Sequence, residues 1–273
     1  GISPSSSDRI PDYSIIDTSI SIIPVGSDEE SLELPVPWII RSPSGLTYPD
    51  GQIRIPSIVD TGPNEGDLLI VGEEELAEFP DNAKEISGII LDLQSLPPMN
   101  DAEIEAILVS LSSHLSSSSL ILLRDGADRI EGLFRLVVDL DLDGAIVSVA
   151  TPEGGRAAAA LPRIGLASRA MGLDVQGRII GIELEKQPSA KDLIIVRASG
   201  CSFIVGPIDE GNEISIITKT IIPEVIGIMK EAGLSNFHNV GRRILRAKDM
   251  ETAAISGLRL IGFERPLPMW LGN

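Results

Sequence analysis

Residues 88–149 read GIILDLQSLPPMNDAEIEAILVSLSSHLSSSSLILLRDGADRIEGLFRLVVDLDLDGAIVSV, and their pattern indicates the class of fold. Three mainly apolar runs of strand length lie within them, at residues 88–93, 120–123 and 144–149. Between these runs, the apolar residues of 100–114 and 128–139 recur at helical spacing. Buried strands that alternate with helices are typical of parallel βαβ units, in which helices cover both faces of the sheet. We therefore predict an α/β protein.

The same rhythm continues on both sides of this region. Towards the N-terminus we predict strands at 32–41, 52–59 and 68–71 and a short acidic helix at 73–79. Towards the C-terminus we predict strands at 177–185, 193–196 and 202–205 and helical segments at 157–170, 214–233 and 239–256. A closed (β/α) barrel and an open, doubly wound sheet fit this order equally well, because periodicity alone does not distinguish them.

Composition and charge restrict the function. The 273 residues suffice for one barrel-sized domain or two small ones. Hydrophobic residues make up 43% of the chain but aromatic residues only 3%, so the core is expected to consist of Ile, Leu, Val and Ala. The formal net charge is −18, from 40 acidic and 22 basic residues. Such a surface repels phosphate backbones and anionic membranes, so we expect no nucleic-acid partner and no membrane partner.

Cysteine content and the first residues bear on the cellular compartment. Cys201 is the single cysteine, so an intrachain disulfide and a four-cysteine metal site are excluded for this chain alone. The chain begins Gly1-Ile2-Ser3-Pro4 without the pattern of a signal peptide. Its apolar runs are far shorter than the ~20 residues of a membrane-spanning helix. We therefore predict a cytoplasmic protein.

Two positions suggest a ligand site. The loop after the strand at 144–149 carries Gly154 and Gly155, which let the backbone approach an anion, and Arg156, which supplies a counter-charge. A plain βα turn is the alternative. Cys201 follows the predicted strand at 193–196, and strand ends face the ligand in α/β folds, so it is a candidate nucleophile or redox group. An inert buried thiol is the alternative here.

The C-terminal third carries a family resemblance. Residues 235–240 (SNFHNV) lead through Leu245-Arg246-Ala247 into KDMETAAISGL at 248–258. This order resembles the closing segment of the flavin-binding domain of glutamate synthase and its archaeal relatives. Weaker matches to the same family follow in order along the chain, at 32–37, 126–131, 143–147 and 153–158.

The resemblance implies a (β/α)8 barrel that binds FMN at the C-terminal ends of its strands. In that family a hydride passes from reduced flavin to an imine of 2-oxoglutarate, and an iron–sulfur cluster and a partner domain supply electrons. The barrel would span 31–265, divergent and shortened relative to the family, and either complete or incomplete and distorted. An extended N-terminal arm at 1–30 precedes it, and a C-terminal tail at 266–273 follows it.

This chain departs from the family at the residues that would hold flavin. The family's strand lysine falls at Arg124, and arginine does not replace a compact donor. The family's double-glycine turn for the flavin phosphate falls at 197–200, where Ser199 and Gly200 are the candidate contacts. Arg156 and Ala157 stand where threonine and glycine are usual.

Two hypotheses follow from these observations. The first is a barrel with altered or lost flavin chemistry that acts as a binding or assembly subunit without a cofactor, either as a homo-oligomer or with a partner protein. The alternative is an FMN-dependent oxidoreductase that acts on a small amino or keto acid, with Arg124 and Cys201 as candidate catalytic residues. The sequence leaves open whether the protein is an enzyme.

Overall fold

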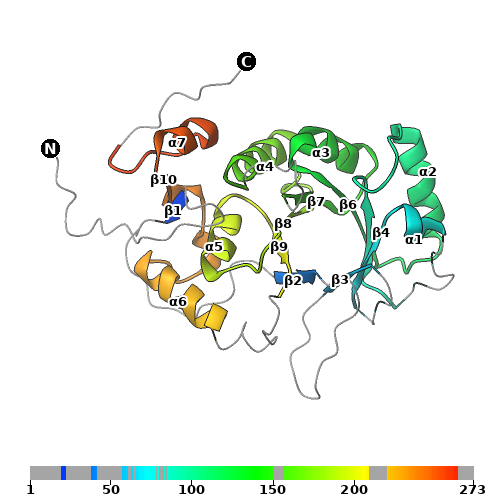
Figure 1. Cartoon of the computed structure of the whole chain (residues 1–273), viewed down its shortest axis with the longest axis horizontal. Coiled ribbons are helices and arrows are strands. Elements are labelled where there is room, and N and C mark those ends of the chain that lie inside the picture. Colours follow the sequence, from blue (N-terminus) through cyan, green and yellow to red (C-terminus); the bar gives the residue numbers. More distant parts are fainter. Residues whose placement is uncertain are drawn as a thin grey trace.

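Eight parallel strands close into a barrel in the computed structural model (Figure 1). The structure describes residues 20–22, 38–41, 57–60, 63, 66–77, 79, 83, 85–149, 157–208 and 220–263. The barrel strands are β2 (Trp38–Arg41), β3 (Ser57–Val59), β4 (Leu68–Val71), β5 (Gly88–Asp92), β6 (Leu120–Gly126), β7 (Gly144–Ser148), β8 (Ile179–Glu183) and β9 (Phe203–Gly206). The predicted α/β barrel is therefore confirmed, and the open sheet is excluded.

The closing contact joins the first and last barrel strands. β2 pairs in parallel with β9, with Ile39 opposite Val205. The indole N–H of Trp38 donates to the carbonyl oxygen of Gly206 at 3.1 Å, across 168 residues of chain. This pairing removes both free edges of the sheet.

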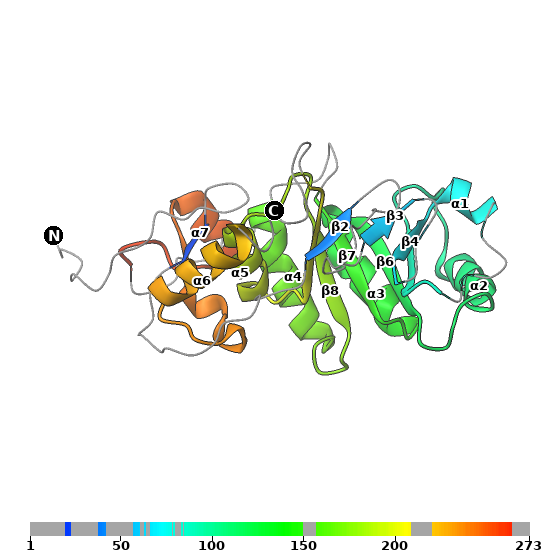
Figure 2. The ribbon, with the colours of Figure 1, turned by 90° about the horizontal axis from the view of Figure 1, so that it is seen from below.

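Helices pack against the outer face of the barrel on several sides (Figures 1 and 2). The helices of the described chain are α1 (Glu73–Ala77), α2 (Asp101–Ser112), α3 (Ile130–Asp139), α4 (Ala157–Met171), α5 (Ala190–Ala198), α6 (Ile222–Glu231) and α7 (Met250–Ser256), and a short 3-10 helix η1 (Ala127–Arg129) precedes α3. Of these, α6 and α7 lie beside the barrel and not on its wall. Two helices begin with a capping box. The Asn100 side chain accepts from the backbone N–H of Glu103, and the Ser189 side chain accepts from that of Asp192. These side chains satisfy N–H groups that have no partner within the helix.

The predicted strand at 193–196 is wrong, because these residues form the middle of α5. The capping box at Ser189 starts a helix three residues earlier. Residues 193–196 are all buried, since α5 packs against both β9 and α6. A short apolar run does not distinguish a strand from a helix that is buried on all sides.

Among the described residues, strand side chains fill the barrel interior. This inner cluster consists of Ile58, Leu68, Ile70, Ile90, Leu122, Ile146, Phe203 and Val205. Gly181 makes room for the ring of Phe203, because a Cβ at Gly181 would lie 2.2 Å from a ring carbon. Alternate residues of a strand point to the same face. The next inward positions towards the carboxyl end are therefore Asp92 on β5, Arg124 on β6 and Ser148 on β7.

A smaller C-terminal module lies beside the barrel (Figures 1 and 2). Its two-stranded antiparallel sheet pairs β1 (Ile20–Ile22) with β10 (Leu245–Ala247). Its helical parts are α6, α7 and the 3-10 helices η3 (Phe237–Asn239) and η4 (Arg242–Ile244). The module packs against α4 and α5. The predicted helical segment at 239–256 is thus wrong over its first half, where η4 and β10 lie, and correct at α7.

The predicted domain boundaries, at 30/31 and 265/266, fall outside the described residues. They stay predictions. No helix in the described part of the chain is long and apolar enough to cross a membrane.

Candidate functional site

A cluster of charged and polar side chains lies at the carboxyl end of the barrel. We call it the mouth cluster, and its members are Arg41, Asp60, Asp92, Arg124, Ser148 and Glu183. Each comes from a different strand, at or near its carboxyl end, or from the residue that follows the strand. Enzymes with this fold place their active sites at this end of the barrel. The mouth cluster is therefore the candidate functional site.

Arg124 is at the centre of the mouth cluster. Its Nε donates to Glu183 Oε2 at 2.6 Å, its Nη1 to Asp92 Oδ1 at 2.7 Å and its Nη2 to Ser148 Oγ at 3.1 Å. Burial alone lowers the pKa of Arg124, but attraction to Glu183 and Asp92, with their hydrogen bonds, outweighs it, so the pKa is raised. The guanidinium is therefore charged and is bonded through all three of its nitrogens.

Glu183 links the two arginines of the mouth cluster. Its Oε2 accepts from Arg124, while its Oε1 lies 3.5 Å from Nε of Arg41. Arg41 also donates through Nη2 to Asp60 Oδ1 at 2.6 Å. The Glu183 side chain is 6% exposed, whereas those of Arg41 and Asp60 are 26% and 32% exposed. The cluster thus has a buried inner pair and a more accessible outer pair.

The charge of the mouth cluster does not suit the phosphate of FMN. It contains three carboxylates and two guanidinium groups, so its net charge is negative. A phosphate site needs N–H donors or cations that are available to the anion. Both arginines already bond to carboxylates. The described residues of the mouth cluster therefore do not fit this group.

The loop predicted to hold an anion, with Gly154, Gly155 and Arg156, lies outside the described residues. It follows β7, whose last residue, Ser148, belongs to the mouth cluster. Its role in binding therefore stays a prediction.

Ser199 and Gly200 lie at the opposite end of the barrel. Ser199 caps the C-terminus of α5, and Gly200 adopts a φ of +100° in the turn that leads back to the start of β9. The premise for a flavin contact here was a preceding strand, and that strand is absent from the described structure. Because strand beginnings face away from the mouth, this reason for expecting a ligand at 199–200 is lost.

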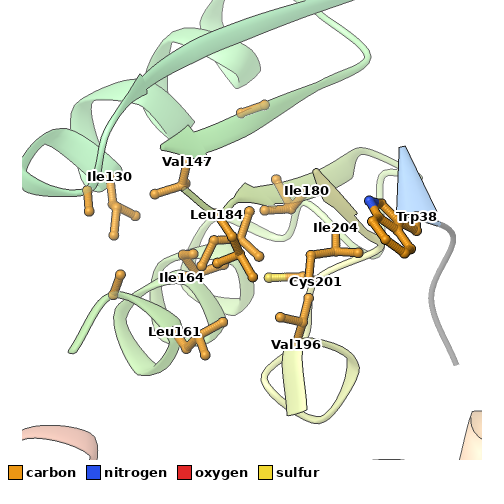
Figure 3. Close-up of a cluster of buried hydrophobic side chains, with 14 of the residues drawn as sticks. Trp38, Ile130, Val147, Leu161, Ile164, Ile180, Leu184, Val196, Cys201 and Ile204 are labelled. Carbon is orange, nitrogen blue, oxygen red and sulfur yellow. The ribbon is translucent and has the colours of Figure 1, made fainter. Parts of the chain in front are cut away.

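Cys201 is buried at the same end of the barrel. Figure 3 shows its sulfur among Ile164, Leu184, Val196 and Ile204. Burial raises the pKa of the thiol to about 12. The thiolate, not the thiol, is the nucleophile, so at neutral pH this side chain is unreactive. The inert buried thiol is the alternative that the structure favours.

Sequence reasoning found Arg124 but not the other members of the mouth cluster. Asp92, Ser148 and Glu183 were included in predicted strands without a role. The available signal was their position, since Asp92 and Ser148 each stand two residues after an apolar inward residue, Ile90 and Ile146. A polar residue at the end of an otherwise apolar, buried strand indicates a strand-end site. Among the described residues, no group of three His, Cys, Asp or Glu side chains could hold a metal ion.

A comparison with a solved structure supports the fold. No family model matches the chain, and no curated protein matches its sequence. A solved structure of a mutant flavocytochrome b2 with benzoylformate matches with a TM-score of 0.53 and 10% identity, over 85% of this chain and 70% of that chain. A structure of DHODH from Eimeria tenella in complex with ferulenol matches with a TM-score of 0.45 and 13% identity, over 67% and 61% of the two chains. At these identities the likeness concerns the fold alone. The relationship to glutamate synthase in particular stays a prediction.

Proposed function

We propose that this protein is a barrel with altered chemistry that acts as a binding subunit and does not use flavin. The observation that carries the proposal is the engagement of Arg124 by Glu183, Asp92 and Ser148. The fold likeness to flavocytochrome b2 and the sequence resemblance to glutamate synthase support descent from flavin-dependent barrels.

The hydrogen-bond donors of Arg124 are already engaged by its neighbours. A catalytic or cofactor-binding cation has to interact with the incoming group, and here the guanidinium of Arg124 already bonds to two carboxylates. Displacing either carboxylate would leave a buried charge without its partner, which costs about 3–5 kcal/mol. Arg124 therefore acts as the centre of a closed ionic network, which fixes strands β5, β6, β7 and β8 relative to one another.

An absorbance spectrum of the purified full chain tests the proposal. We expect no flavin band, and none after incubation with FMN followed by desalting. Arg124→Lys restores the compact donor of the family and is expected to remain colourless as well, because Glu183 and Asp92 still neutralise it. A yellow protein that retains one FMN per chain would overturn the proposal. It would support the alternative, an FMN-dependent oxidoreductase acting on a small amino or keto acid.

The subunit role needs a separate measurement. Light scattering on the full chain gives its mass in solution, and we expect a homo-oligomer or a stable complex with a partner protein. A monomer that forms no such complex would contradict the binding-subunit role, even if the protein proved colourless.

A further inference from the structure

A pocket with several arginines lies in the C-terminal module, away from the mouth cluster. Its volume is about 320 Å³, and it is lined by Arg242, Arg243, Leu245, Arg246, Gly257, Leu258 and Arg259. We call it the arginine pocket. Its two walls are the η4–β10 segment and the segment that follows α7. These walls are joined by backbone hydrogen bonds from Ala247 N to Arg259 O at 2.9 Å and from Ile261 N to Ala247 O at 3.0 Å.

None of the pocket arginines pairs with a carboxylate in the described part of the chain. Arg242 donates through Nη2 to the carbonyl oxygen of Ser256, which ties the two walls together. Arg246 donates through Nη1 to the carbonyl oxygens of Arg243 and Leu245, at 2.9 and 2.8 Å. These partners are neutral backbone groups, so no carboxylate among the described residues compensates the charges of Arg242 and Arg246.

The pocket differs in this respect from most of the described arginines of the barrel. On the barrel, Arg124, Arg135 and Arg163 each lie within 3 Å of a carboxylate oxygen. The whole chain carries a net charge of −18. Among the described residues, this group of arginines without carboxylate partners is therefore a local exception in a chain that has an excess of acidic residues.

The pocket arginines also act on one another. Burial lowers the pKa of Arg242, and the nearby Arg169, at the end of α4, lowers it further. Burial likewise lowers the pKa of Arg246, with a further contribution from Arg259. Like charges at short range destabilise a folded chain unless an anion lies between them. An anion placed between these guanidinium groups would relieve their repulsion.

We propose that the arginine pocket binds a small multivalent oxyanion that carries phosphoryl or carboxylate groups. The planar fork of a guanidinium matches two oxygens of such a group and binds it with charge-assisted hydrogen bonds. A volume of about 320 Å³ lies at the lower end of the range for small-molecule sites. Leu245 and Leu258 supply an apolar wall for an uncharged part of the ligand. The proposal is independent of the function proposed for the mouth.

Calorimetric titration of the full chain tests the proposal, with tripolyphosphate as the phosphoryl probe and citrate as the carboxylate probe. We expect saturable binding of one probe molecule per chain, with an affinity that falls as salt is added. The probe that binds more tightly identifies the preferred oxyanion group. Inorganic phosphate is expected to bind more weakly than tripolyphosphate, because it engages fewer guanidinium groups.

The pocket variant is the double substitution Arg243→Gln with Arg259→Gln. Both side chains are exposed, so their removal leaves the fold intact. A charge-assisted hydrogen bond contributes roughly a factor of ten in affinity or more, so we expect at least tenfold weaker binding. The matched control, Arg135→Gln with Arg163→Gln, removes the same charge from α3 and α4 and should bind like the wild type.

Three results would overturn the proposal. They are no saturable binding to the wild type, equal affinity of the wild type and the pocket variant, or an equal loss in the control. The flavin spectrum is unaffected by any of these results, so failure of this proposal is distinguishable from failure of the function proposed above.

Discussion

Glu183 at the end of β8 accepts a 2.6 Å hydrogen bond from Arg124 on β6, across the intervening strand β7. The two side chains are 6% and 13% exposed. In this setting an ion pair is expensive to break, because the remaining partner stays buried and charged. The pair is therefore a structural constraint on the barrel mouth as well as part of the candidate site.

The first prediction concerns this pair. Glu183→Gln should lower the free energy of unfolding by about 3 kcal/mol, because Arg124 and Arg41 both lose a carboxylate. Urea unfolding measures the change. In the double variant with Arg124→Met the loss should be smaller than the sum of the single losses, since the uncompensated guanidinium is absent.

The control is Arg163→Gln, which breaks an exposed ion pair with Glu131. It should lower the free energy of unfolding by about 1 kcal/mol or less. Equal losses in the buried and exposed variants would contradict this account.

The second prediction concerns packing inside the barrel. Gly181→Ala places a Cβ 2.2 Å from the ring of Phe203, so Phe203 has to move within a closed interior. Overpacking of this kind costs about 1–3 kcal/mol. Phe203→Leu in the same chain should recover part of the loss, because the smaller side chain vacates the space. Thermal unfolding measures each step.

The matched control for this prediction is Gly132→Ala. Gly132 lies in α3, and an added Cβ there meets nothing within 4 Å. Alanine is the better helix former by about 0.5–1 kcal/mol, so this substitution should stabilise the protein. If Gly181→Ala stabilised the protein as well, the close approach of β8 to Phe203 would be refuted.

Much of the fold follows from the sequence, for physical reasons that differ between elements. The apolar runs at 88–93, 120–123 and 144–149 are strands in the structure because their side chains pack on both faces of the barrel wall. The closure of the sheet into a barrel could not be predicted from the periodicity of the apolar residues. It depends on the contact of β2 with β9, between residues such as Trp38 and Gly206 that lie 168 positions apart.

The site was harder to predict than the fold. Its six members come from the region of six different strands, so no local motif brings them together. The family resemblance points to Arg124, whereas the local pattern of Glu183 and Asp92 indicates only strand residues. The arginine pocket was missed because Arg242 and Arg259 are neighbours only after β10 has paired beside the segment that follows α7. In both sites, tertiary contacts bring together residues that local patterns keep apart.

The third prediction concerns Asp125, which is 4% exposed beside the mouth. Burial raises its pKa, although the N–H of Gly126 donates to it at 2.7 Å and Arg129 lies nearby. A carboxyl with a raised pKa in the folded state favours folding at low pH, and this contribution is lost as the pH rises. Asp125→Asn should therefore stabilise the protein at pH 7 relative to the wild type, and this gain should shrink as the pH falls through the acidic range. Asn keeps an acceptor for Gly126.

Unfolding measured at several pH values checks this prediction. Asp128→Asn removes the same charge from an exposed neighbouring position and is the control. A gain for Asp125→Asn that grew as the pH fell would have the opposite sign and would show that the carboxylate is stabilised in the fold.

The fourth prediction concerns Cys201, whose pKa burial raises from 9.0 to about 12. The folded protein holds the thiol proton, whereas the unfolded chain releases it above pH 9, so the stability due to this group is present below pH 9 and is lost as the pH rises towards 12. At pH 10, one unit above the unfolded pKa, the loss is about 1.4 kcal/mol. The wild type should therefore lose more stability than Cys201→Ala between pH 8 and pH 10. Other groups titrate in both proteins and cancel in the difference.

Thiol labelling gives a second measurement. A thiol reagent should label Cys201 in the native protein only as fast as the structure around the sulfur opens. Rapid labelling of the native protein at pH 8 would refute the buried position of the sulfur.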